Sequence, residues 1–127
     1  MNNYDAIFYE VLALTKAERL GWRQIGRKEN VEIILNSHLV IRQFSTSFER
    51  EHGALSLLLL ERRHLYNEED FFIERLEGRR AELLILANGE LITNLTEMSI
   101  RFAKMMELLD LVIEQSNRKL LHLPAPV

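Results

Sequence analysis

The sequence predicts an α+β domain in which three helices pack on a small, mostly antiparallel sheet. Three features of the 127 residues support this fold class. An amphipathic run lies near the C-terminus, an Asn-Gly pair separates two apolar segments, and short β-branched or aromatic runs fill the middle of the chain. The expected order of elements is helix, three strands, helix, two strands and helix.

The run near the C-terminus predicts the clearest of the three helices. Its apolar residues alternate in steps of three and four, so they share one face of a helix. These residues are Leu95, Met98, Phe102, Met105, Leu109 and Val112. Asn94 and Glu97 have the spacing of a helix cap and its acidic partner, which predicts that the helix opens at Asn94.

Two other segments carry capping signals. Thr15 and Glu18 have the form of a capping box, which starts a helix or lies within a longer helix that begins near Asn3. Asn67 precedes three acidic residues, which a helix N-terminus favours, and Gly78 follows as a stop signal. The middle helix is therefore expected between Asn67 and Gly78.

The strands are expected in the segments between the helices. Five short apolar runs have the composition of strands; they are residues 31–35, 39–48, 54–60, 82–86 and 90–93. Asn88 and Gly89 separate the last two runs, and this pair predicts a two-residue type I′ hairpin turn. An all-helical four-helix bundle remains the alternative, because short apolar runs fit a helical period as well.

Length and composition are those of one folded domain. With 47% hydrophobic and 28% charged residues, a single globular unit is expected over residues 1–122, followed by a short Pro-containing tail at 123–127. The chain has no cysteine, which excludes disulfides, zinc–thiolate sites and thiol nucleophiles. No early segment resembles a signal peptide and no uncharged run is long enough to cross a membrane, so the expected location is the cytoplasm.

The charge pattern argues against a nucleic-acid partner. The formal net charge is −3, and the basic residues are interleaved with acidic ones along the chain. A nucleic-acid-binding domain is expected to carry a basic stripe. The charges are therefore interpreted as solvated surface.

Two Glu-x-x-His pairs are the strongest candidates for chemistry. Glu49 with His52, and Glu61 with His64, would each place a carboxylate and an imidazole on one helix face, as in di-iron bundles. Such a site needs further carboxylates on other helices, and here the two pairs are close together with Gly53 between them. No histidine has a recognisable orienting partner, and no phosphate-binding glycine motif occurs. We expect no metal, no cofactor and no enzyme activity; a metal-dependent or acid–base enzyme is an alternative.

Some apolar residues outside the regular runs are candidates for interfaces. Trp22, the single tryptophan, is expected to pack in the core at the end of the first helix rather than to anchor an interface. Phe71, Phe72 and Ile73 follow one another on the short middle helix. A helix with one buried face covers only some of them, so they belong either to an interface or to a well-covered core.

The element order resembles that of the class I type III secretion chaperones, small acidic proteins with an amphipathic C-terminal helix. The closest local likeness is the run from Glu90 to Thr96 that leads into Phe102, Met105 and Leu109. The resemblance implies a non-catalytic cytosolic chaperone that, as a homodimer, binds an extended segment of a secreted protein. No nucleic acid, membrane or small molecule is expected as a partner.

The same resemblance implies where the two interfaces lie. The middle helix would form the dimer interface, with Phe71, Phe72 and Leu76. Exposed apolar strips on strands would cover the partner segment; the candidate residues are Val31, Ile33, Leu39, Ile41 and Phe44. The alternative function is that of a helical adaptor, such as a flagellar-export-type chaperone or a transcription regulator.

Overall fold

The computed structural model describes residues 3–51, 53–63 and 78–122. Within them the chain forms two helices, one short 3-10 helix and a five-stranded antiparallel sheet in which the strands follow their order in the sequence. The elements are α1 (Asn3–Lys16), β1 (Arg23–Ile25), η1 (Ser37–Leu39), β2 (Val40–Arg50), β3 (Gly53–Arg63), β4 (Arg79–Ala87), β5 (Glu90–Leu95) and α3 (Phe102–Leu120). The predicted α+β class is confirmed, and the four-helix bundle is wrong.

The expected middle helix lies outside the described residues. So do Phe71, Phe72 and Leu76, the residues assigned to a dimer interface, and the expected tail at 123–127. These parts of the sequence analysis stay predictions.

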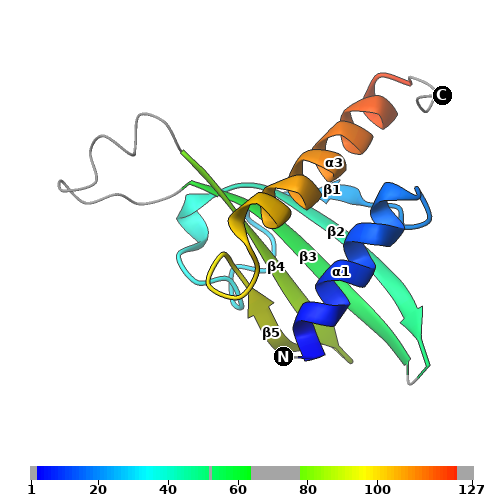
Figure 1. The fold of residues 1–127 in the computed structure, drawn as a ribbon. Helices are drawn as coiled ribbons and strands as arrows, with labels where there is room; N and C mark the ends of the chain where they lie inside the picture. Colours follow the sequence, from blue (N-terminus) through cyan, green and yellow to red (C-terminus); the bar gives the residue numbers. More distant parts are fainter. Residues whose placement is uncertain (1–2, 52, 64–77, 123–127) are drawn as a thin grey trace.

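Both helices lie on the same face of the sheet, as Figure 1 shows. The strand register places Phe44, Leu59, Leu83 and Leu95 side by side across β2 to β5, and all four are buried. The helices cover this row with apolar side chains of their own: Phe8, Val11, Leu12, Met105, Leu108, Leu109 and Val112. Because each such side chain contributes about 1.5–3 kcal/mol when it leaves water, this layer is the main core.

A loop of residues 26–39 covers half of the opposite face. Leu58, Leu60 and Leu84 alternate with the residues of the main core, and Ile34 of the loop packs on them in a second, smaller core. Gln43 is fully buried and fastens the loop to the sheet. Its amide nitrogen donates to the carbonyl oxygens of residues 26, 27 and 29, at 3.3, 3.2 and 2.6 Å.

Residues 31–35 belong to this loop and do not form the predicted strand. Asn30 and Asn36 flank the segment with left-handed backbone, at φ 61° and 54°, which interrupts an extended chain on both sides. The first strand is instead β1, where Arg23 pairs with Ser45 of β2. β1 was not predicted, because its three residues are too few to show the alternation of apolar and polar side chains that marks a strand. The other four predicted strands correspond to β2, β3, β4 and β5.

Helix α1 ends where the capping-box pattern predicted a possible start. Thr15 is buried in its last turn, where its hydroxyl donates to the carbonyl of Val11 at 2.8 Å and accepts from the indole N–H of Trp22 at 3.0 Å. Glu18 has left-handed backbone, φ 57°, which is typical of a helix C-terminus. The helix begins at Asn3, as the alternative interpretation predicted, and Trp22 packs in the core as expected, with 1% of its surface exposed.

Helix α3 begins at Phe102, later than the predicted start at Asn94. Asn94 is part of β5, opposite Leu84, and its side-chain amide donates to Glu82 at 2.7 Å instead of capping a helix. Pairing with a buried strand therefore outweighs the local capping signal. The apolar face of the helix is buried as predicted at Met105, Leu109 and Val112.

The hairpin between β4 and β5 is confirmed. Ala87 pairs with Glu90, and the two residues between them, Asn88 and Gly89, have φ values of 54° and 79°. A type I′ turn requires positive φ at both central positions, which asparagine and glycine adopt most easily. A Cβ atom on Gly89 would meet nothing within 4 Å, so it is the backbone conformation that requires glycine.

Gly89→Ala is expected to lower the free energy of unfolding by about 1 kcal/mol, because alanine adopts left-handed backbone at a cost. Urea unfolding followed by circular dichroism measures this difference. Gly78→Ala is the matched control: Gly78 also has open space around it but no positive φ, so its unfolding free energy should stay within about 0.5 kcal/mol of the wild type. Equal effects of the two substitutions would contradict the assignment of the turn.

Candidate protein-binding surface

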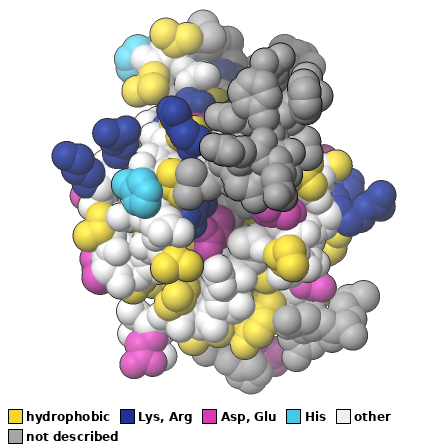
Figure 2. Space-filling model, turned by 90° about the vertical axis from the view of Figure 1, so that its left-hand side faces the viewer, with side chains coloured by type: hydrophobic (Ala, Val, Ile, Leu, Met, Phe, Trp, Pro, Cys, Tyr) yellow, Lys and Arg dark blue, Asp and Glu magenta, His cyan; other side chains and the backbone are white. Residues whose placement is uncertain are grey.

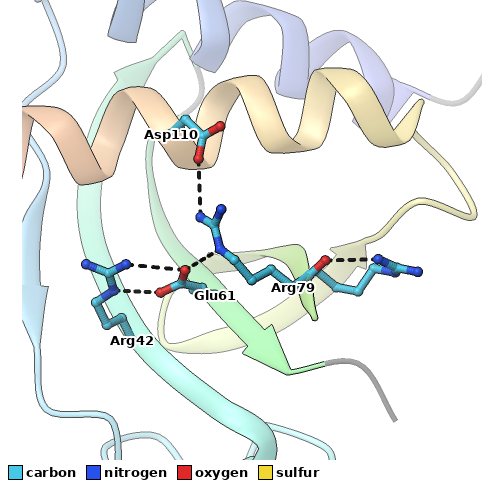
Figure 3. A network of polar contacts seen from close by, with 5 residues as sticks. Arg42, Glu61, Arg79 and Asp110 are labelled. Atoms are coloured by element: carbon cyan, nitrogen blue, oxygen red, sulfur yellow. Dashed lines mark hydrogen bonds and ion pairs between the residues drawn. The ribbon is translucent and has the colours of Figure 1, made fainter. Parts of the chain in front are cut away.

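Glu61, from the second Glu-x-x-His pair, is the first residue to test for chemistry. It points toward the helices and is only 2% exposed. Arg42 Nε donates to one of its carboxylate oxygens at 2.6 Å, and Arg79 Nε donates to the other at 2.7 Å. Arg79 also donates to Asp110 of α3 at 3.2 Å, so the network joins three strands to a helix (Figure 3).

This environment keeps Glu61 ionised. Burial alone would raise the pKa of the carboxyl, but the hydrogen bonds and charges of Arg42 and Arg79 together hold it below its ordinary value of 4.5. A general acid must hold a proton near neutral pH, and a metal ion beside Glu61 would be repelled by the charges of two arginines. Glu61 is ionised and engaged at both oxygens, so its arrangement is that of a structural ion-pair network.

Glu82 is a second buried carboxylate, on the opposite face of the sheet. Arg62 donates to one of its oxygens at 2.5 Å, and Asn94 donates to the other. The same guanidinium donates to the carbonyl oxygen of Leu35 at 2.8 Å, which fastens the end of loop 26–39. Glu82 is therefore also a structural residue.

The described histidines lie apart from these carboxylates. His38 is exposed in η1 and His122 is exposed after α3, while His52 and His64 lie outside the described residues. Within residues 3–51, 53–63 and 78–122, no group of three His, Cys, Asp or Glu side chains is placed to hold a metal ion. The exposed parts of the sheet offer other surfaces.

One such surface is the half of the sheet face that loop 26–39 leaves open. The register places Ser47, Ser56, Leu86 and Leu91 side by side across β2 to β5. The two serines and Leu91 are exposed and Leu86 is half-buried. This open half-face, defined by these four residues, is polar toward β2 and apolar toward β5.

The apolar side of the open half-face ends at an edge strand. β5 is the last strand of the sheet, and none of the described strands pairs with its outer edge. Leu91 is 40% exposed and its neighbour Ile92 is 44% exposed. Proteins commonly protect such edges with lysine, proline or a bulge. β5 has neither lysine nor proline, and its protection consists of a register shift near Leu86 and the charge of Glu90.

Figure 2 shows the molecule from the side on which β5 and loop 26–39 lie in Figure 1. Hydrophobic side chains are visible in several groups among polar ones, rather than as one continuous patch. A surface of this kind suits a partner that makes backbone hydrogen bonds and places only some side chains on apolar sites.

The predicted partner-binding residues are not gathered on one surface. Phe44 is fully buried beneath the helices, so its assignment to an exposed strip is wrong: its side chain belongs to the main core. Ile33, Leu39 and Ile41 are half-buried around loop 26–39, and only Val31 is substantially exposed, at 50%. The alternation along β2 identified its two faces, but the sequence did not indicate which face the helices cover.

Leu91 and Ile92 lie in an expected strand but were not predicted to form a surface. The signal that was present is the pair of adjacent apolar residues directly after the hairpin turn, which gives the strand an apolar residue on each face. Their exposure follows from the position of β5 at the edge of the sheet, and strand order is a property of the whole fold.

No helix among the described residues is long and apolar enough to cross a membrane. Comparison of the chain with protein-family models, with curated proteins and with solved structures found no match. The likeness to class I type III secretion chaperones therefore stays a resemblance of element order.

Glu61→Gln is expected to lower the free energy of unfolding by about 2 kcal/mol at neutral pH, because two arginines lose a charged hydrogen-bond acceptor. Since the folded-state pKa of Glu61 lies below 4.5, its ionised form stabilises the fold above that pH, and the stabilisation is lost as the pH falls through the lower, folded-state pKa. The difference between variant and wild type should therefore shrink in acid.

Urea unfolding at pH 7 and in acid tests this expectation. Asp110→Asn serves as the control, because Asp110 contacts the same arginine with a side chain that is 63% exposed, and its loss should change the unfolding free energy by no more than about 0.5 kcal/mol. A Glu61→Gln difference that stays the same at both pH values would show that the charge of Glu61 does not stabilise the fold.

Proposed function

We propose that the protein is a non-catalytic cytosolic chaperone that, as a homodimer, holds an extended segment of a secreted partner protein along β5. The observation that supports this proposal is the outer edge of β5, which no described strand occupies and which carries the exposed side chains of Leu91 and Ile92. An extended segment added there gains backbone hydrogen bonds and places alternate side chains next to the apolar end of the open half-face.

The dimensions of β5 limit what one such contact contributes. A partner strand paired along its six residues spans about 20 Å, and burying the remaining surface of two apolar side chains contributes a few kcal/mol at most. One edge alone therefore binds weakly. Two edges in a homodimer can hold two parts of one long segment, and linked contacts of this kind raise the overall affinity strongly.

The alternative functions have less support. The helical adaptor rested on a four-helix bundle, and the five-stranded sheet removes that basis. An acid–base or metal-dependent enzyme would have used Glu61, whose carboxylate is already paired with Arg42 and Arg79. The chaperone proposal needs neither a helical groove nor a reactive carboxylate.

Leu91→Lys is expected to weaken binding of the partner segment about tenfold, because it replaces an apolar contact with a charge at the edge of the sheet. The partner is isolated by affinity capture with the wild-type protein, and its bound segment, mapped by protease protection, is titrated against both proteins. Amide hydrogen exchange should slow along β5 in the wild-type complex.

Leu120→Lys is the matched control, since Leu120 is also an exposed leucine but lies at the end of α3. It should bind as the wild type does, and both variants should melt within about 3 °C of the wild type. Unchanged affinity of Leu91→Lys, or protection of a folded domain of the partner in place of an extended segment, would refute binding at β5.

The second expectation concerns the oligomeric state. Light scattering at high micromolar concentration should give twice the chain mass of 15.0 kDa, and Phe72→Asp should shift the protein toward monomer by placing a charge in the proposed apolar interface. Leu121→Asp, which changes an exposed leucine after α3, should leave the mass unchanged. A monomeric wild type would rule out the homodimer.

A further inference from the structure

The segment from Arg19 to Lys28 is the most basic part of the described chain. It contains Arg19, Arg23, Arg27 and Lys28 and no acidic residue, so the expected interleaving of basic and acidic residues does not hold here. All four side chains are exposed. None of them forms an ion pair or a side-chain hydrogen bond with another described residue. Most of the other described cations do: Lys16, Arg42, Arg50, Arg62, Arg79, Arg80, Lys104 and Arg118.

This basic segment passes through β1, the strand at the opposite edge of the sheet from β5. β1 pairs with residues 43–45 of β2, and among the described strands none occupies its outer edge. Gly21, just before β1, lies against β2, where the hydroxyl of Thr46 donates to its carbonyl oxygen at 2.6 Å. Backbone donors and acceptors along this edge can accept an extended chain. The outer edge of β1 and the four cations that lack a described ion-pair partner therefore lie in the same segment of the chain.

The surface beside β1 is hollowed at two places, and neither hollow is bordered by an acidic side chain among the described residues. A depression of about 560 Å³ is bordered by Arg19, Arg23 and the hydroxyl groups of Ser45, Ser47 and Ser56. A smaller one of about 290 Å³ is bordered by Arg27, Lys28 and His38, on the part of the chain that follows β1. Arginine, lysine and hydroxyl groups are the usual donors to carboxylates and other oxyanions.

We propose that the β1 edge is a second binding site, which takes an extended acidic segment of a protein by strand addition. The segment pairs through its backbone with the outer edge of β1. Its carboxylates meet the four cations. The positive charge has a second effect, because it repels the identical edge of another copy and so disfavours pairing of two copies through β1.

An acidic polypeptide fits this edge better than a nucleic acid does. Single-stranded nucleic acids gain much of their affinity from bases that stack on exposed aromatic rings, and the one aromatic residue of the segment, Trp22, is buried. The free backbone groups of an edge strand are matched by another polypeptide. This proposal does not depend on the function proposed for β5, because the two sites lie at opposite edges of the sheet.

The test uses a fluorescein-labelled ten-residue peptide in which glutamate and threonine alternate, with fluorescence anisotropy as the readout. The wild-type protein should bind it, should bind the glutamine–threonine peptide at least tenfold more weakly, and should lose affinity as salt rises from about 50 to about 200 mM. Hydrogen exchange should slow at β1 when the acidic peptide is bound.

The double variant Arg19→Gln with Arg23→Gln should bind the acidic peptide about three- to tenfold more weakly, since each exposed charge pair contributes a modest amount. Arg101→Gln removes an exposed arginine just before α3 that forms no ion pair with another described residue, and it should bind normally, as should Leu91→Lys. No binding of the acidic peptide, or equal binding of the glutamine peptide, would overturn the proposal. So would tighter, arginine-dependent binding of a ten-nucleotide thymidine oligomer, which would assign the edge to nucleic acid instead.

Discussion

Strands β3 and β4 are covered by the helices on one face and by loop 26–39 on part of the other, so the polar side chains at their covered positions need partners within the protein. The four consecutive leucines at positions 57–60 are all buried, which follows from coverage on both faces. Gln43, Glu61 and Glu82 lie in the same covered region, and each is hydrogen-bonded. Their bonds fasten the loop and α3, so the covering elements are held by polar contacts as well as by apolar packing.

Polar contacts also join the two ends of the chain. The side-chain amide of Gln115 in α3 donates to the carbonyl oxygen of Thr15 at 3.0 Å, and Lys119 donates to the carbonyl oxygen of Trp22 at the same distance. With the hydrogen bond from Trp22 to Thr15, these contacts set the course of the chain from α1 to β1. The cations of the segment that follows are therefore presented along the β1 edge.

The two edges of the sheet differ in character, and this difference is the basis for proposing two distinct binding surfaces. β5 exposes two apolar side chains and carries one charged residue at its start, whereas β1 begins with an arginine and lies in a segment with four cations. Two extended chains of different composition would each favour one edge. The buried ion pairs between the edges stabilise the sheet and leave the reactive groups of Glu61 and Glu82 occupied.

The sequence by itself determined the features that depend on neighbouring residues. The Asn88–Gly89 turn, the buried face of α3 and the positions of β2 to β5 follow from local backbone preference and apolar periodicity. Tertiary structure decided the rest. Asn94 joins a strand because β4 and Glu82 provide partners. Residues 31–35 lie in a loop that Gln43 fastens by the carbonyl groups just before them and that packs Ile34 on the second core. A buried polar group needs a hydrogen-bond partner, and here that partner comes from a residue distant in sequence. Such a contact overrides the local preference of the segment, and a local sequence pattern does not reveal it.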